Sequence, residues 1–168
     1  MPCKVLMMDV DGVLVSGRPS DGRHLFAELE ADLGLSPDRL REAFFTPFWE
    51  AIVTGREALT EQLTPVLARG VSVFLATNQE HMRADYLMQQ VGLGAHVDGI
   101  IYSAALGHRK PAAEFFERAA AIAGAAPEDI VLVDDTLANI EAARRAGWYT
   151  VHWTGESTLD DELTRYLS

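Results

Sequence analysis

Residues 4–13 read KVLMMDVDGV, and this stretch decides the fold class of the chain. Its first half, KVLMM, is an almost continuous apolar run, which is typical of a strand buried on both faces of a parallel sheet. The run ends in Asp9 and Asp11, whereas a signal peptide would end in small residues. The stretch therefore predicts a buried strand with carboxylates at its carboxyl end.

Strand-like and helix-like patterns alternate through the second part of the chain. Further apolar runs typical of strands lie at residues 71–76, 99–102, 130–133 and 149–152. Helical patterns lie at residues 80–91, 111–123, 137–146 and 159–167. Pro111 suits the first turn of a helix, and Gly124 suits the end of the same helix. The alternation predicts an α/β domain, in which helices cover both faces of a parallel sheet.

Residues 17–68 have a different pattern, with several short helical stretches and no convincing strand. The segment follows the first predicted strand and precedes the second. We therefore expect a small helical cap at 17–68, inserted into a core domain that comprises residues 1–16 and 69–168.

Composition limits the class of protein. The 168 residues are 48% hydrophobic, which allows a sizeable core, and their formal net charge is −11. This acidic balance argues against a nucleic-acid partner, because phosphate backbones attract Lys and Arg. No apolar run approaches the ~20 residues of a membrane helix, so no membrane partner is expected. Cys3 is the only cysteine, which excludes an internal disulfide and favours a cytoplasmic location.

Polar side chains cluster at or beyond the ends of the predicted strands. They are Asp9 and Asp11, Thr77 and Asn78, Lys110, and Asp134 and Asp135. Because ligands of such sheets bind at the carboxyl ends of the strands, we expect these residues to meet in one crevice. Each motif alone is also typical of a turn or a solvated loop, and their joint order favours a functional site.

This mixture of side chains suits phosphoryl transfer. Clustered carboxylates repel one another, and Mg²⁺ relieves the repulsion while it binds a substrate phosphate oxygen. Lys110 and Thr77 could hold other phosphate oxygens, and a carboxylate is a credible nucleophile toward phosphorus. By contrast, His24, His96 and His152 show no metal-ligand spacing. His81 and Arg83, at the start of a helix, are expected to be solvated.

On these motifs the sequence resembles the haloacid dehalogenase-like superfamily of hydrolases. Asp9 and Asp11 match the first motif of the family, Thr77 the second and Lys110 the third. The acidic pair of Asp134 and Asp135 matches the fourth motif. The resemblance implies a Rossmann-like three-layer α/β/α sandwich with a helical cap, which is shortened in this chain. The stretches LATNQEHMRADYL, GHRKP and IVLVDDTLANIEAARRAGW are most similar to one branch. This branch includes small bacterial sugar-phosphate phosphatases and the phosphatase domain of soluble epoxide hydrolase.

The resemblance also implies roles for the first and fourth motifs. Asp9 would be the nucleophile and a ligand of Mg²⁺. Asp11 would act first as general acid and then as general base, with its backbone carbonyl on the metal. Asp135 would bind the metal directly, and Asp134 would support it or reach the metal through water.

The remaining motif residues would bind the substrate, which the resemblance implies is a small phosphorylated metabolite such as a sugar phosphate. Thr77, Asn78 and Lys110 would contact the phosphate side, and Asn139 would steady the acidic pair. A dehalogenase, a phosphomutase and a phosphate-binding module are alternatives, although dehalogenases of the superfamily lack a counterpart of Asp11.

The shortened cap leaves two alternatives for how the crevice is covered. A lone subunit would discriminate weakly among phosphate esters, or a second subunit would cover the site as a homodimer. The aromatic residues that would make such a contact, or else pack within the cap, are Phe44, Phe45, Phe48 and Trp49.

Overall fold

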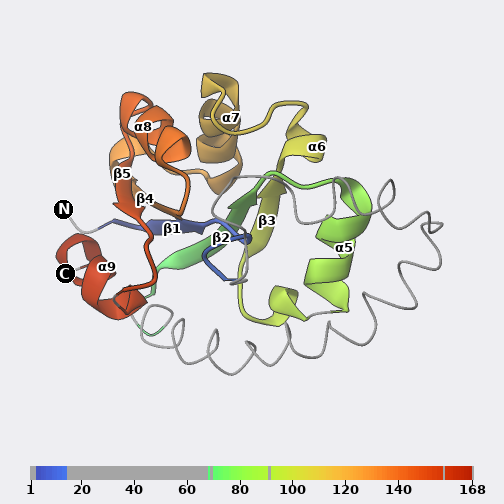
Figure 1. Ribbon diagram of the computed structural model, residues 1–168, viewed down its shortest axis with the longest axis horizontal. Helices are drawn as coiled ribbons and strands as arrows, with labels where there is room; N and C mark the ends of the chain where they lie inside the picture. The colour runs from blue at the N-terminus through green and yellow to red at the C-terminus, as the bar shows by residue number, and fades with distance from the viewer. Residues whose placement is uncertain (1–2, 15–67, 69, 91, 157, 168) are drawn as a thin grey trace.

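The computed structural model describes residues 3–14, 68, 70–90, 92–156 and 158–167. They include one sheet of five strands in the order β3-β2-β1-β4-β5, and every paired neighbour runs parallel (Figure 1). The strands are β1 (Val5–Met8), β2 (Ser72–Thr77), β3 (Gly99–Tyr102), β4 (Ile130–Asp134) and β5 (Tyr149–His152). The predicted α/β class and parallel sheet are confirmed.

The α-helices within these ranges are α5 (His81–Gln89), α6 (Ser103–Leu106), α7 (Ala113–Ala123), α8 (Leu137–Arg145) and α9 (Leu159–Leu167). Two 3₁₀ turns, η2 (Leu93–Ala95) and η3 (Pro127–Asp129), complete the set. The sequence pattern does not predict α6, η2 or η3, because so few residues cannot display a helical period. None of the helices in the described ranges is both long and apolar enough to span a membrane.

The ends of α7 show how local sequence sets a boundary. Pro111 lies before the helix rather than in its first turn, because Ala112 keeps an extended backbone as the N-cap. Gly124 ends the helix as predicted, with a left-handed φ of 63° and an N–H directed to the carbonyls of Ala120 and Ala121. Such a conformation favours glycine because it has no Cβ.

The continuous apolar run of β1 is explained by two cores, one on each face of the sheet. Leu6 and Met8 belong to the cluster that includes side chains of α5 and α9, whereas Val5 and Met7 belong to the cluster with α7 and α8. Figure 1 shows these two pairs of helices on opposite sides of the sheet. Alternate side chains of a strand point to opposite faces, so a strand between two cores must be apolar at every position.

The ends of β1 and β4 lie side by side at the point in the sheet where the strand order changes direction. From β1 the chain adds β2 and β3 on one side, and then returns to add β4 and β5 on the other. Asp9 follows β1, and Asp134 is the last residue of the adjacent β4. In open α/β sheets this switch point opens a crevice for ligands.

The predicted cap at 17–68 lies outside the described residues except for position 68, which is in a turn. The same holds for His24 and for the four aromatic residues Phe44, Phe45, Phe48 and Trp49. The division into core and cap and the homodimer through the cap therefore stay predictions.

We expect the core beneath α7 to depend on Phe116, which is fully buried and packs edge-to-face on Phe115 and Trp148. Phe116→Ala should lower the free energy of unfolding by about 3–5 kcal/mol, because it leaves a cavity between α7 and the sheet. Ile122→Ala on the same helix is the control, since the Ile122 side chain is 59% exposed. Urea titration measures both variants, and equal losses would contradict this account of the core.

Candidate active site

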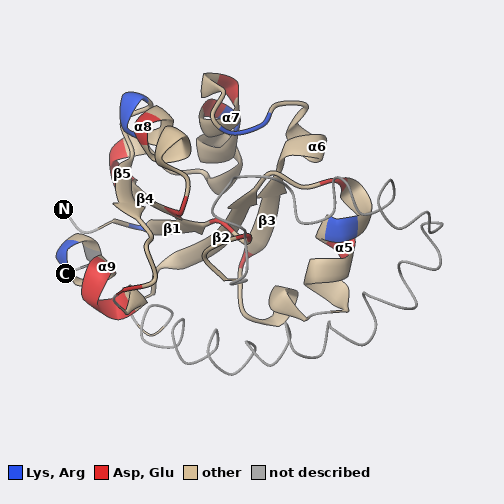
Figure 2. Ribbon diagram, viewed as in Figure 1, with Lys and Arg blue, Asp and Glu red and all other residues tan. Residues whose placement is uncertain are grey.

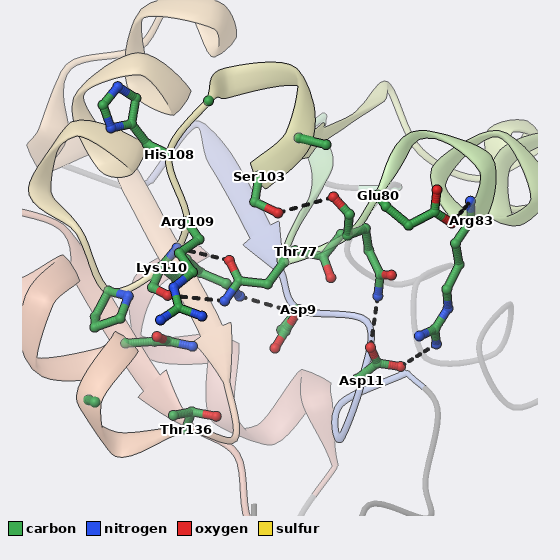
Figure 3. A pocket seen from close by; sticks show the side chains of 17 residues that line it. Asp9, Asp11, Thr77, Glu80, Arg83, Ser103, His108, Arg109, Lys110 and Thr136 are labelled. Carbon is green, nitrogen blue, oxygen red and sulfur yellow. Dashed lines mark hydrogen bonds and ion pairs between the residues drawn. The ribbon is translucent and has the colours of Figure 1, made fainter. Parts of the chain in front are cut away.

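The described residues line a cleft of about 1010 Å³ at the carboxyl ends of the strands (Figure 3). The cleft brings together six of the predicted site residues, which are Asp9, Asp11, Thr77, Asn78, Lys110 and Asn139. Figure 2 shows acidic residues at the ends of β1 and β4, and a basic stretch on the loop that leads into α7. Opposite charges from distant parts of the sequence therefore meet at this edge of the sheet.

The ammonium group of Lys110 lies at the centre of this arrangement. Its Nζ is 2.6 Å from Asp134 Oδ2 and 3.1 Å from Asp9 Oδ1, and it also donates to the carbonyl oxygen of Ala76 at 2.6 Å. Lys110 is buried, with 2% of its surface exposed. A buried ammonium is stable only when it is paired and hydrogen-bonded, and here each of its three protons has an acceptor within reach.

Asp134 has its carboxylate saturated by protein donors. Oδ2 accepts from Lys110, while Oδ1 accepts from the Thr136 N–H at 2.8 Å. Asn139 Nδ2 lies 3.0 Å from Oδ1 and 3.1 Å from Oδ2. Asn139 comes from the first turn of α8, as its predicted supporting role requires. These contacts suit Asp134 to hold Lys110 in place.

Asp9 is buried at the end of β1, where its Oδ1 accepts a hydrogen bond from the Val10 N–H at 2.8 Å. Burial raises the pKa of Asp9 to about 6, Asp134 adds to the rise, and Lys110 and the Val10 N–H oppose it. Desolvation disfavours the charged form of a carboxylate, and nearby positive charge restores it. A cation beside Asp9 would therefore favour its ionised form.

The third acid of the cluster, Asp135, approaches the loop after β1 at Gly12. Gly12 has a φ of +87°, and a Cβ at this position would collide with the Asp135 carboxylate. Only glycine fits both the backbone conformation and the close approach. His152 lies at the end of β5, and its Nε2 is 3.0 Å from the Asp135 carbonyl oxygen. The spacing of histidines in the sequence does not indicate this contact.

Asp9, Asp134 and Asp135 each offer a carboxylate oxygen, and these oxygens all lie within 4.8 Å of one another. Three carboxylates beside the single charge of Lys110 leave two negative charges when all are ionised. Hard carboxylate oxygens are the ligands that Mg²⁺ prefers. The donor set and the charge therefore fit a divalent cation of this kind.

Thr77 and Asn78 continue from the end of β2 into the cleft. Thr77 is buried and lines the cleft. The Asn78 side chain accepts from the Lys110 N–H at 2.8 Å and donates to the Lys110 carbonyl at 3.0 Å. Both ends of its amide thus hold the Lys110 backbone, so the contacts support a positioning role. The predicted contact of Asn78 with substrate stays a prediction.

Asp11 has two partners that the sequence pattern does not predict. Its Oδ2 accepts a hydrogen bond from Gln79 Nε2 at 2.7 Å, and its Oδ1 pairs with Arg83 Nη2 at 2.6 Å. The expectation of a solvated Arg83 is therefore wrong, because 22% of its side chain is exposed and its charge is paired. Sequence position could have indicated the Gln79 contact, since Gln79 directly follows the Thr77-Asn78 motif at the edge of the sheet that carries the acids.

A sequence pattern shared by haloacid dehalogenase-like hydrolases matches residues 21–147. The chain belongs to this family. The match includes the residues of β2, β3 and β4. Thr77 at the end of β2, Ser103 just after β3 and Thr136 shortly after β4 line the cleft. The family that the motifs predict is thus confirmed.

Two relatives of this hydrolase are similar in sequence. It is 28% identical over 119 residues to the chloroplastic protein SUPPRESSOR OF QUENCHING 1 of Arabidopsis thaliana, over 67% of this chain and 11% of that protein. It is 31% identical over 109 residues to the sesquiterpene phosphatase astK of Aspergillus oryzae, over 65% of this chain and 56% of that protein. The aligned part of this chain thus spans a minor part of the first relative and about half of the second.

Solved structures confirm the fold of the hydrolase. A predicted HAD-like family hydrolase from Porphyromonas gingivalis is 20% identical, with a TM-score of 0.66 over 99% of this chain and 98% of that chain. The HAD family enzyme bt-2542 of Bacteroides thetaiotaomicron, in complex with magnesium and inorganic phosphate, is 17% identical. Its TM-score is 0.65 over 95% of this chain and 98% of that chain.

We expect Lys110→Met to destabilise the metal-free hydrolase by about 3–5 kcal/mol, because it leaves the buried carboxylates of Asp9 and Asp134 without their counter-ion. The double variant Lys110→Met with Asp134→Asn should recover part of this loss, since one of the two uncompensated charges is removed. Urea unfolding in the presence of a chelator measures both variants.

Lys4→Met is the matched control for this experiment. Lys4 pairs with Asp129 at 2.8 Å, but its side chain is 68% exposed, so solvent screens the pair. The control should therefore change stability far less than Lys110→Met. Similar losses for the two lysine variants would show that Lys110 does not have the electrostatic role described here.

Proposed function

We propose that this hydrolase is a magnesium-dependent phosphatase of small phosphate monoesters, such as sugar phosphates, and that Asp9 forms an aspartyl-phosphate intermediate. The observation that carries the proposal is the Asp9 carboxylate, buried at the switch point of the sheet and 3.1 Å from the ammonium of Lys110. Asp11, two residues further along the chain, lines the same cleft and provides a second carboxylate. Among the described residues, its ion pair is with Arg83 and not with Lys110.

In the first step, a carboxylate oxygen of Asp9 attacks the phosphorus atom of the ester. The bond between phosphorus and the ester oxygen breaks, and its electron pair stays on that oxygen. Protonated Asp11 gives its proton to the same oxygen, so an alcohol leaves and Asp9 carries the phosphoryl group. Lys110 and Thr77 would hold the non-bridging phosphate oxygens as negative charge shifts among them.

In the second step, water replaces Asp9. Asp11, now a carboxylate, accepts a proton from the water molecule while the water oxygen attacks phosphorus. The bond between phosphorus and the Asp9 oxygen breaks, and its electrons return to the Asp9 carboxylate. Inorganic phosphate leaves, and Asp11 is again protonated for the next cycle. One residue thus serves both proton transfers because its protonation state alternates between them.

Asp9 and Asp135 are the residues that would hold Mg²⁺, together with the backbone carbonyl of Asp11. The saturated contacts of Asp134 suit it to a supporting role, because Lys110, Asn139 and Thr136 already occupy its oxygens. When bound, the cation would offset the clustered negative charge and draw electron density from a phosphate oxygen.

The relatives support the same chemistry. The sesquiterpene phosphatase astK is named for phosphate hydrolysis, and bt-2542 was crystallised with magnesium and inorganic phosphate. The contacts proposed for Thr77, Lys110 and Mg²⁺ would engage only the phosphate group, which all monoesters share. They leave the organic part of the substrate undefined, so the proposal extends to the ester class and not to one metabolite.

We expect the purified protein to release inorganic phosphate from members of a panel of sugar phosphates and aryl phosphates when Mg²⁺ is present. Excess chelator should abolish turnover and added Mg²⁺ should restore it, whereas Ca²⁺ should restore it poorly because its larger coordination shell misplaces the nucleophile. Asp9→Asn should lack turnover in every condition, because a neutral amide does not attack phosphorus.

Phosphate release in excess chelator would contradict the magnesium requirement. Undiminished activity of Asp9→Asn would exclude this residue as the nucleophile. A protein that hydrolyses no ester in the panel, but binds inorganic phosphate with Mg²⁺, would instead be the binding module named above as an alternative.

Asp11→Asn should reduce turnover of alkyl phosphates by about 10²–10⁴-fold, because the leaving alkoxide needs a proton. The loss in the first step should be smaller with p-nitrophenyl phosphate, whose leaving group is stable without a proton. Single-turnover measurement of alcohol or nitrophenol release isolates this step from the later hydrolysis. Equal losses with the two leaving groups would contradict the role of Asp11 as general acid.

A further inference from the structure

The Asp11 carboxylate is held at both oxygens by residues that have no role in the two steps above. Gln79 Nε2 donates to Oδ2 at 2.7 Å, and Arg83 Nη2 donates to Oδ1 at 2.6 Å. Figure 3 shows the Arg83 side chain reaching Asp11 from α5. The Arg83 and Asp11 side chains are 22% and 28% exposed, so water has limited access to the ion pair.

These two donors are themselves fixed to regular structure. The Gln79 carbonyl accepts from Ser103 Oγ at 3.0 Å and from the Ala104 N–H at 3.1 Å, which ties it to the start of α6. Glu80 is the N-cap of α5, and its carboxylate accepts from the N–H groups of Met82 and Arg83. An anchor attached to helix starts can hold a carboxylate more rigidly than solvent could.

We propose that Arg83 and Gln79 are positioning residues for proton transfer, and that they act through Asp11 without touching the substrate. The inference rests on the proposed phosphatase function, since it requires Asp11 to be the general acid and base. It extends that function to a segment, residues 79–83, that none of the four family motifs contains.

The geometry allows the anchor to persist through both protonation states of Asp11. Each carboxyl oxygen has two lone-pair positions, and in the structure one protein donor occupies each oxygen. A remaining position on either oxygen can carry the transferable proton or accept one from water. The planar guanidinium of Arg83 restricts the direction of its hydrogen bond, and this restriction fixes the orientation of the Asp11 carboxylate.

The test compares wild type with Arg83→Met and Arg83→Lys on two substrates, glycerol phosphate and p-nitrophenyl phosphate, in saturating Mg²⁺. For Arg83→Met, release of glycerol in the first turnover should slow by about 10²-fold, because even a misplacement of about 1 Å makes a catalytic group much less effective. Release of nitrophenol should slow by less than about 5-fold, because this leaving group hardly needs the proton. Arg83→Lys should recover part of the rate, since it keeps the charge but loses the planar geometry.

A double-variant comparison separates action through Asp11 from direct contact with the substrate. In the Asp11→Asn background, Arg83→Met should cause no further loss of glycerol release, because the group it positions is already inactive. Gln79→Met should show the same dependence on the leaving group as Arg83→Met. It also provides an independent measurement if Arg83→Met folds poorly by circular dichroism.

Arg165→Met is the matched control, because Arg165 is also paired with a carboxylate, Glu162 at 3.3 Å, but lies on α9 outside the cleft. Its rates on both substrates should equal those of wild type. If Arg83→Met lowers both rates equally, raises KM alone, or adds its full effect to Asp11→Asn, the positioning role is overturned. Wild type that hydrolyses neither ester would instead overturn the proposed function itself, together with the role that depends on it.

Discussion

The ammonium of Lys110 is the group on which the rest of the site depends. Because β1 and β4 are adjacent, Asp9 and Asp134 are brought close together in a region from which water is excluded. Two such carboxylates would repel each other, and both would lose hydration energy, unless a positive charge lay between them. Lys110 supplies that charge from a loop, and Ala76 and Asn78 at the end of β2 hold the loop in place. The buried ammonium group of Lys110 thus links the ends of β1, β2 and β4.

Around this ammonium group, three chemically identical side chains lie in different surroundings. Asp134 has its oxygens occupied by protein donors, which suits it to hold Lys110 in place. Asp9 has fewer donors and a pKa raised to about 6 by burial, which suits a group that becomes reactive beside a cation. Asp11 is more exposed than Asp9 and is paired with Arg83, and the proposed mechanism gives it both proton transfers. The roles proposed for the three acids follow from these differences in burial and hydrogen bonding.

The family relationship and the structure bear on different parts of this account. The match over residues 21–147 establishes a haloacid dehalogenase-like hydrolase, and the solved neighbours establish its fold. The relatives leave the organic part of the substrate open. The contacts of Gln79 and Arg83 with Asp11, by contrast, are seen in this chain itself and give a reason why a segment outside the motifs should affect proton transfer.

The sequence by itself determined the strands, the main helices and the placement of Asp9, Thr77, Lys110 and Asp134 at one edge of a parallel sheet. It could do so because apolar periodicity and the position of a residue relative to a strand end are local properties. The tertiary structure decided which side chains touch. Arg83 and Asp11 are 72 positions apart, and nothing in either local pattern distinguishes a solvated arginine from one directed at a carboxylate. Such pairing depends on where the tertiary fold positions each residue, because a hydrogen bond forms only over about 3 Å.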